Sequence, residues 1–323
     1  MKSAVLPFTI DVELRPYHNK AFPIGIAKAN MADYDIWLCN KFINVFKTSD
    51  GAFNAYDEDS YSLSDGFVMK KTIDLPTRAY ENNGIDLVEL NKFMVIEEWY
   101  ISGNYNEFYI KGKEPYNSHD FNHDYIIFGY DDEQKVFKSA AYMADGSYSF
   151  YDIECENYYK SIIGSKTERV YVNYYKVNKN YTPTLDVKSI KEKLLNYLYS
   201  RKDAQGTETK FFWGMEAWAK FVEYIENIGE NKLDCRYSRC YMEHKVVMLK
   251  RIEKLLELGY LKEVELYEEY SKSVYVPAQT LHNLFLKYNV SQNKKVICRI
   301  IEIGRRANER EVSLIREMIE RLN

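Results

Sequence analysis

NHDYIIFGYDDEQKVF, residues 122–137, is the stretch of this chain that most constrains its fold. The apolar run from Tyr125 to Tyr130 predicts a strand, the acidic residues after it predict a turn, and Lys135 begins a second strand that runs back. His123 stands at the start of the first strand. We therefore expect an antiparallel hairpin with an imidazole at its entrance.

The segments on both sides of this hairpin divide the chain near residue 180. Before it, short apolar and aromatic runs alternate with turn signals such as Ala144-Asp145-Gly146, and residues 169–177 alternate as a strand does. After Pro183, apolar residues recur at helical spacing in five stretches: 186–198, 213–228, 241–258, 278–288 and 294–322. We expect an α+β domain with an antiparallel sheet over 1–180 and an all-helical domain over 181–323.

The composition is that of a folded protein and does not indicate binding to nucleic acid or to a membrane surface. Of 323 residues, 46% are hydrophobic and 28% charged, which is enough apolar material for sizeable cores. The net charge of −4 argues against nucleic acid and against a membrane surface as partners. No run reaches the roughly 18 apolar residues of a membrane span. The N-terminus has no signal-peptide pattern and the five cysteines are scattered, so we expect a cytoplasmic location.

The hairpin, with its Gly129-Tyr130-Asp131-Asp132 segment, resembles the histidine-containing hairpin of papain-fold bacteriocin-leader peptidases. It is closer still to the N-terminal domain of the butirosin biosynthesis protein H-like family, which also places a strand-rich domain before a helical one. The resemblance implies a papain-like cysteine protease fold for 1–180. It also implies an amide-forming acyl transfer from a carrier protein to an amine. No cofactor is implied beyond the phosphopantetheine arm of the carrier. Apart from this resemblance, His123 is simply a polar residue that opens a strand.

A site of this type uses a cysteine at the start of a helix as the nucleophile and the histidine as its base. Cys39 is the only cysteine before His123, so these two residues are the candidate catalytic pair. We expect the histidine to depress the pKa of the Cys39 thiol. Two alternatives stay open. Cys39 is also explained as a small buried apolar residue. Alternatively, Pro16-Tyr17-His18-Asn19 aligns with the family's Cys-Tyr-His pattern, in which case Pro16 has replaced the cysteine and the site is inactive or rebuilt.

The residue that would orient His123 is not evident from the sequence. Relatives place an Asp or Asn near the end of the second strand, where this chain has Ser139-Ala140-Ala141, and Asp145 follows late, in a turn. His18 and His119 are further candidate site residues, although surface positions explain both more simply.

Two groups of residues in the helical half invite other interpretations. The first group consists of Cys235, Cys240 and His244. Its spacing is not that of a zinc signature, so we expect no metal. The second is basic and is a candidate docking face for an acidic carrier protein, although a solvated helix face explains it as well. Its members are Arg236, Arg239, Lys245, Lys250 and Arg251.

These observations favour a cysteine-dependent acyl or peptidyl transferase that joins a carrier-bound thioester to a small-molecule amine in natural-product biosynthesis. A thioester is already activated, so no ATP site is needed, and the sequence has no Gly-rich phosphate loop. The rival hypothesis is a non-catalytic member of the same fold that binds a carrier protein or a biosynthetic intermediate. A leader-cleaving protease is a weaker third, because the helical half and the lack of a transporter segment do not match such exporters.

Overall fold

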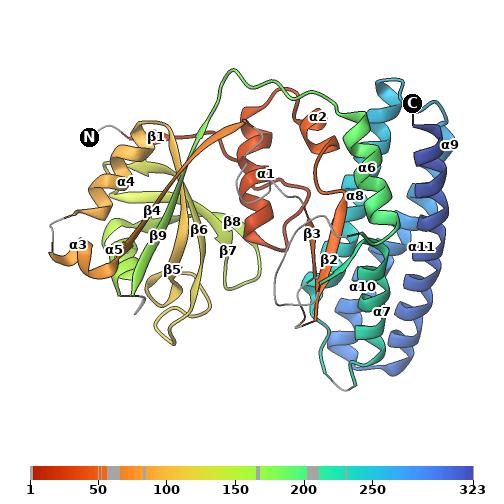
Figure 1. Ribbon diagram of the computed structural model, residues 1–323. Coiled ribbons are helices and arrows are strands. Elements are labelled where there is room, and N and C mark those ends of the chain that lie inside the picture. Colours follow the sequence, from red (N-terminus) through yellow and green to blue (C-terminus); the bar gives the residue numbers. More distant parts are fainter. Residues whose placement is uncertain are drawn as a thin grey trace. The chain divides into compact units, whose positions relative to one another are not determined.

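The chain forms two compact units, which are described separately (Figure 1). The structure is a computed structural model that describes residues 3–49, 51, 53–56, 66–82, 85–164, 168–201, 211–229 and 231–322. Unit 1 comprises Met1–Val12, His18–Ala32 and Asp59–Thr182, and unit 2 comprises Glu13–Tyr17, Asp33–Glu58 and Pro183–Asn323. The last boundary lies close to the expected division at 180/181. Two segments of the front half nevertheless belong to the helical unit, one of them because its strands pair with a strand near residue 212.

Unit 1 is built around an antiparallel sheet. In the described residues the sheet has seven strands, in the order β4-β9-β5-β6-β7-β8, and β1 pairs with β6. The expected hairpin is confirmed, because β6 and β7 are antiparallel and Tyr130 lies opposite Phe137. The strand expected over 169–177 is confirmed as β9. The strands are β1 (Ala4–Val5), β4 (Val68–Pro76), β5 (Trp99–Asn106), β6 (Asn122–Asp131), β7 (Val136–Tyr142), β8 (Tyr148–Glu154) and β9 (Arg169–Val177).

Helices pack on both faces of this sheet. The alternation of β6 directs Tyr125 and Ile127 into the apolar core that is shared with α4 and α5, while Ile126 faces the side of α1. The helices of unit 1 are α1 (His18–Asn30), α3 (Thr77–Asn82), α4 (Leu87–Ile96) and α5 (Cys155–Ile163), together with a short 3₁₀ turn, η1 (Glu107–Tyr109). The two faces of the sheet therefore differ. One carries the apolar core with α4 and α5, and α1 packs on the other.

Helix α1 packs closely on the N-terminal segment and on the sheet. The Asn30 amide donates hydrogen bonds to the hydroxyl of Tyr100, at 2.9 Å, and to the carbonyl of Pro7, at 3.0 Å. A Cβ atom at Gly25 would lie 2.6 Å from the carbonyl oxygen of Thr9, so only glycine permits this approach. These contacts fix the position of the first residue of α1, His18, relative to the strands.

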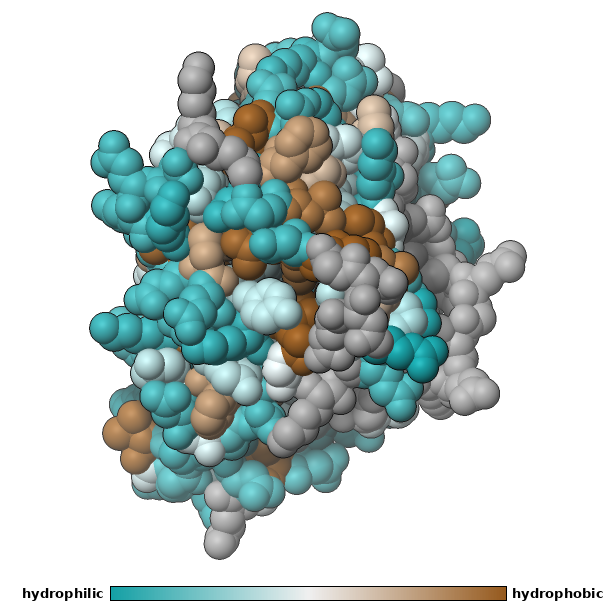
Figure 2. Space-filling model, turned by 90° about the vertical axis from the view of Figure 1, so that its left-hand side faces the viewer, coloured by the Kyte–Doolittle hydropathy of each residue, from teal (hydrophilic) through white to brown (hydrophobic). Residues whose placement is uncertain are grey.

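The surface of unit 1 is mixed in character. Figure 2 shows the side that lies at the left of Figure 1, where brown apolar residues reach the surface between teal hydrophilic ones. The exposed large apolar side chains of this unit include Val5, Met69 and Phe93. Singly exposed apolar residues are normal on soluble domains and do not by themselves identify a binding surface. In the part of the chain that the structure describes, no helix is both long enough and apolar enough to span a bilayer.

Unit 2 is mainly helical, as expected for the C-terminal part of the chain. Asp186 caps the first helix after the boundary by accepting a hydrogen bond from the backbone N–H of Ser189, at 2.9 Å. A three-stranded sheet, ordered β10-β2-β3, accompanies the helices among the described residues. The elements are α2 (Tyr34–Cys39), β2 (Asn44–Thr48), β3 (Phe53–Tyr56), α6 (Val187–Leu198), β10 (Phe211–Trp213), α7 (Gly214–Glu226), α8 (Cys235–Glu257), α9 (Val264–Tyr270), the π-helical turn η2 (Ser271–Tyr275), α10 (Val276–Ser291) and α11 (Lys294–Arg321).

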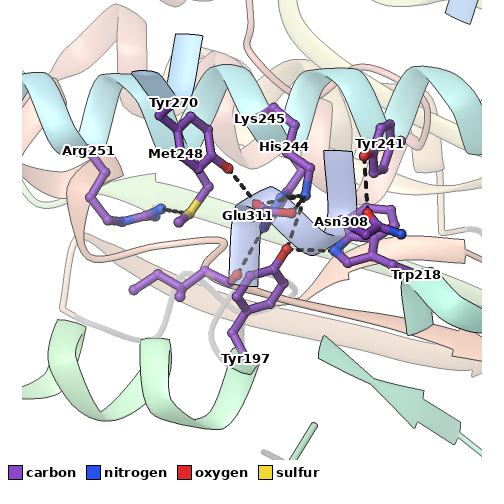
Figure 3. A network of polar contacts seen from close by, with 11 residues as sticks. Tyr197, Trp218, Tyr241, His244, Lys245, Met248, Arg251, Tyr270, Asn308 and Glu311 are labelled. Atoms are coloured by element: carbon purple, nitrogen blue, oxygen red, sulfur yellow. Dashed lines mark hydrogen bonds and ion pairs between the residues drawn. The ribbon is translucent and has the colours of Figure 1, made fainter. Parts of the chain in front are cut away.

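The core of unit 2 contains a buried ion pair between α8 and α11 (Figure 3). Lys245 Nζ lies 2.7 and 2.9 Å from the two carboxylate oxygens of Glu311, and both side chains are fully buried. The hydroxyls of Tyr197 and Tyr270 complete the network, and the ammonium lies 4.1 Å from the centre of the Trp218 ring. Burial lowers the pKa of Lys245 to about 8, and the Glu311 carboxylate opposes this effect. Each buried charge is thus paired and hydrogen-bonded, which buried charges require.

His244, next to Lys245, makes the stability of unit 2 depend on acid. Burial lowers the pKa of His244 well below its usual value. Below about pH 6.5 the unfolded chain therefore binds a proton that the native imidazole does not. We expect unfolding free energy to fall between pH 6.5 and 5, with His244 contributing up to about 2 kcal/mol. In His244→Gln this part of the pH dependence disappears, whereas His119→Gln, a change of an exposed histidine, leaves it intact. Urea unfolding at several pH values measures the slope, and equal slopes for all three proteins would contradict the prediction.

Candidate functional site

The candidate catalytic arrangement in unit 1 is a histidine held by a buried carboxylate. His123 Nδ1 lies 3.0 Å from Oε1 of Glu107. A carboxylate only accepts hydrogen bonds, so Nδ1 carries the proton and Nε2 keeps its lone pair. The His123 side chain is 39% exposed and that of Glu107 only 6%. An accessible imidazole whose back is fixed by a buried carboxylate is the arrangement of a general base.

The register of the sheet places these two residues together. Tyr105 of β5 lies opposite His123 of β6, and Asn106 lies opposite Asn122. Glu107 follows immediately at the end of β5, where the Asn106 side chain caps the turn η1 by accepting from the N–H of Phe108, at 3.0 Å. The chain between the two strands is long, so the sequence alone did not indicate that Glu107 and His123 meet. A prediction of the β5–β6 register would have indicated that Glu107 and His123 lie close together.

His18 packs against His123 on the other side. The two ring centroids are 4.6 Å apart, and Nε2 of His18 accepts a hydrogen bond from the backbone N–H of Tyr142, at 3.4 Å. Nδ1 of His18 is buried and makes no hydrogen bond within the described residues. Burial lowers the pKa of His18 well below its usual value, and neighbouring His123 and Lys113 lower it further. His18 is therefore neutral near pH 7. It is not the surface group that the sequence suggested.

Lys113 places a positive charge behind the carboxylate. Its Nζ lies 3.6 Å from Oε1 of Glu107 and donates to the backbone carbonyl of Tyr142, at 2.6 Å. Burial lowers the pKa of Lys113 to about 8, and the nearby Glu107 carboxylate limits this effect. The lysine thus balances the charge of Glu107 in a region that admits little water.

The residues expected to orient His123 have other roles. The Ser139 hydroxyl is buried in β7 and donates to the backbone carbonyl of Ile126, at 2.6 Å. Ala140 and Ala141 are buried in the same strand and have no polar side-chain atom. Asp145 is exposed and accepts from the N–H of Ser147 in its turn, at 2.8 Å. The carboxylate comes instead from Glu107, which directly follows β5, the strand before the histidine. His119 is exposed and bonds to Ser118, as expected for a surface residue.

Cys39 lies in unit 2, whereas His123 lies in unit 1. The Cys39 side chain belongs to the short helix α2 and is 2% exposed. Its Sγ is 3.9 Å from the backbone carbonyl of Arg251. Burial raises the pKa of the thiol to about 11, which is opposite to the depression expected from a paired histidine. These properties fit the alternative interpretation, in which Cys39 is a small buried apolar residue. The catalytic Cys39–His123 pair stays a prediction, which thiol labelling can test.

A pocket of about 320 Å³ in unit 1 lies between α1 and the strands β4, β9, β5 and β6. Asn19, which follows His18 in α1, and Asp124, which follows His123 in β6, line this pocket, whereas the two histidines themselves do not. Polar side chains make up much of its lining, together with apolar residues of α1. A concave site of this kind is where a small substrate is expected.

A larger pocket, of about 710 Å³, lies in unit 2 between η2, α10 and α11. Arg310 at its edge pairs with Glu269, at 3.0 Å. Unlike the smaller pocket, it is not lined by a chain neighbour of His18 or His123. We therefore take the smaller pocket as the candidate substrate site.

The five basic residues of the predicted docking face do not all lie on the exposed side of α8. Lys245 and Arg251 are buried, and Arg251 donates to the backbone carbonyls of Cys39 and Lys41. The other three are paired with carboxylates: Arg236 with Asp234, Arg239 with Glu243 and Lys250 with Glu13. Helical spacing did not distinguish the buried side of α8 from the exposed one, because both carry basic residues.

No arrangement of three or more His, Cys, Asp or Glu side chains that would hold a metal ion occurs within the described ranges. His244, one of the residues considered for zinc, instead hydrogen-bonds through Nε2 to the backbone carbonyl of Ile43, at 2.9 Å. Comparison of the chain with protein-family models gave no match, and comparison with curated proteins gave no significant match. The functional argument therefore depends on the geometry.

Proposed function

We propose that unit 1 catalyses the transfer of an acyl or peptidyl group from a carrier-bound thioester to an amine, with His123 as general base and Glu107 as the residue that orients it. The observation that carries this proposal is the 3.0 Å contact between a part-exposed imidazole and a buried carboxylate; the same unit has a pocket of about 320 Å³ that is lined by Asp124, the chain neighbour of His123. Neutral His18 and buried Lys113 surround the pair without competing for its proton.

In the proposed reaction the amine attacks the thioester carbonyl directly. As the C–N bond forms, Nε2 of His123 takes a proton from the nitrogen, and Glu107 stabilises the resulting imidazolium through Nδ1–H. The tetrahedral intermediate collapses with cleavage of the C–S bond. The proton on His123 then passes to the departing thiolate of the phosphopantetheine arm, which returns the imidazole to its starting state. No ATP is consumed, because the thioester carries the activation.

The proposed ancestry is papain-like. The contact between the rings of His18, which begins α1, and His123, the second residue of β6, supports this proposal. Under the alternative alignment, Pro16 stands where the family has its cysteine. The only cysteine of unit 1, Cys155, is the first residue of α5 and packs against the core. The proposed reaction therefore proceeds without a covalent acyl-enzyme.

Cys39 provides the test of this direct mechanism. We expect Cys39→Ala to form amide from a carrier-bound thioester at a rate within about twofold of the unmodified protein, because the buried thiol takes no part. Iodoacetamide should label native Cys39 more slowly than exposed Cys298, since the pKa of the Cys39 thiol is raised to about 11. Intact mass measured during turnover should show no acyl adduct. An adduct that is lost in Cys39→Ala would establish the Cys39–His123 pair instead.

A non-catalytic binding protein is the second candidate, and the burial of Cys39, which raises the pKa of its thiol, favours it. In that case the chain binds the carrier or its acyl group without turnover. Calorimetry with an acylated carrier, run beside an amide-formation assay, distinguishes the two. Binding without product over several amine acceptors would select the second candidate.

A further inference from the structure

The pocket of about 320 Å³ has opposite charges at its two ends. Asp124 of β6, the chain neighbour of His123, lines one end, and Lys70 of β4 lines the other end. Strands β9 and β5 lie between β4 and β6, so the two backbones are roughly 14 Å apart. Among the described residues neither Asp124 nor Lys70 has an ion-pair partner. Both charges are thus available to a bound molecule.

The carboxylate of Asp124 is held in place by its neighbour. The Asn104 amide donates to Oδ1 of Asp124, at 2.7 Å, across the β5–β6 pair. This hydrogen bond uses one of the acceptor sites of the carboxylate and leaves the others open. A preorganised carboxylate beside the proposed base is suited to bind an ammonium group.

The middle of the pocket is apolar on one wall and neutral and polar on the other. Phe22, Pro23 and Ile26 of α1 line the first wall, and Ser102 and Asn173 lie on the sheet side. Asn173 Oδ1 accepts from the Thr72 hydroxyl, at 2.8 Å, so its side chain is fixed. A chain of methylene groups fits between these walls better than a second charge does.

We propose that this pocket binds the amine substrate as an ω-amino acid, with its ammonium on Asp124, its methylene chain along α1 and its carboxylate on Lys70. The assignment of this molecule as the acyl acceptor rests on the proposed function, whereas its binding does not. Asp124, the chain neighbour of the proposed base, acts as a specificity residue for the ammonium, which loses one proton to solvent before it attacks as the free amine. Lys70 sets the length of the acceptor from the far end.

Three probes separate the two charges. They are 6-aminohexanoate, its N-acetyl derivative, which lacks the ammonium, and hexylamine, which lacks the carboxylate. Binding to the full chain is measured by calorimetry and by changes in amide NMR signals. We expect 6-aminohexanoate to bind about tenfold more tightly than either analogue, with a preference that shrinks as salt is raised.

Substitutions assign each preference to its residue. Asp124→Asn should abolish the preference over the N-acetyl derivative only, and Lys70→Met the preference over hexylamine only. Lys71→Met is the matched control for the lysine, because Lys71 is the next residue of β4 and lies over the Trp99 ring. Asp152→Asn is the control for the carboxylate, since Asp152 of β8 pairs with Lys138 of β7. Both controls should bind all probes as the unmodified protein does.

The outcomes separate this inference from the proposed function. Equal affinities for the three probes, or preferences that survive both Asp124→Asn and Lys70→Met, would overturn the inference. If the charge preferences hold but no amide forms from the thioester, the binding site stands and the proposed function fails. If amide forms with KM unchanged in Asp124→Asn, the reaction stands and this acceptor site is wrong.

Discussion

His123→Ala will lower kcat/KM for amide formation from a carrier-bound thioester by about 10²–10⁴-fold. The imidazole is the part-exposed proposed base held by Glu107, and alanine leaves nothing in its place to take the proton from the attacking amine. Single-turnover assays with a preloaded carrier measure this effect without interference from carrier exchange.

Glu107→Gln tests the other half of the pair. The glutamine keeps the size of the side chain, but its amide can donate to Nδ1 and so favour the tautomer in which Nε2 is protonated. We expect a loss comparable to that of His123→Ala, and the double variant should be no slower than the single ones, because the residues act as one unit. Circular dichroism must show the same fold in each variant.

His119→Ala is the matched control, since His119 is an exposed histidine of the same unit that bonds to Ser118. Its activity should equal that of the unmodified protein. If His123→Ala and Glu107→Gln both keep full activity, His123 is not the base and the proposed mechanism is wrong. If they lose activity but also fail to bind the carrier, the pair is structural instead.

Lys245→Met will lower the free energy of unfolding by about 3–5 kcal/mol, which is the second large effect that we expect. The substitution leaves the Glu311 carboxylate fully buried opposite an apolar side chain, although the Tyr270 hydroxyl, 2.5 Å away, still donates to it. An uncompensated buried charge costs more than the ion pair itself contributes. Chemical unfolding followed by far-ultraviolet circular dichroism measures the change.

The double variant Lys245→Met/Glu311→Leu should recover most of this loss, because it removes both charges from the core. Lys220→Met serves as the control. It breaks the surface pair of Lys220 with Glu223 in the same unit and should change stability by less than about 1 kcal/mol. A Lys245→Met protein as stable as the control would mean that water reaches Glu311 and that the pair is not buried in solution.

Local signals in the sequence determined the secondary structure of several segments. The hairpin at 122–137 and the strand at 169–177 followed from alternation and from acidic turn residues, which depend on near neighbours alone. The helix that begins after Asp186 followed from a capping side chain and apolar residues three and four positions apart. The N-terminus of α8 was missed by several residues, because its first turns carry polar and basic residues that do not show the apolar period.

The sequence by itself also singled out His123 as a candidate base, because its position at the start of a strand is a local property. Only the tertiary structure decided its partner. Glu107 reaches His123 through the register of β5 and β6, which the long intervening chain does not encode. In the same way, pairing of β2 with β10 assigns the segment that contains Cys39 to unit 2. Lys245 of α8 is buried and paired with Glu311 of α11, although its residue type alone predicted exposure. In each case the deciding energy comes from contacts between residues far apart in the chain, and periodicity and turn signals do not report those contacts.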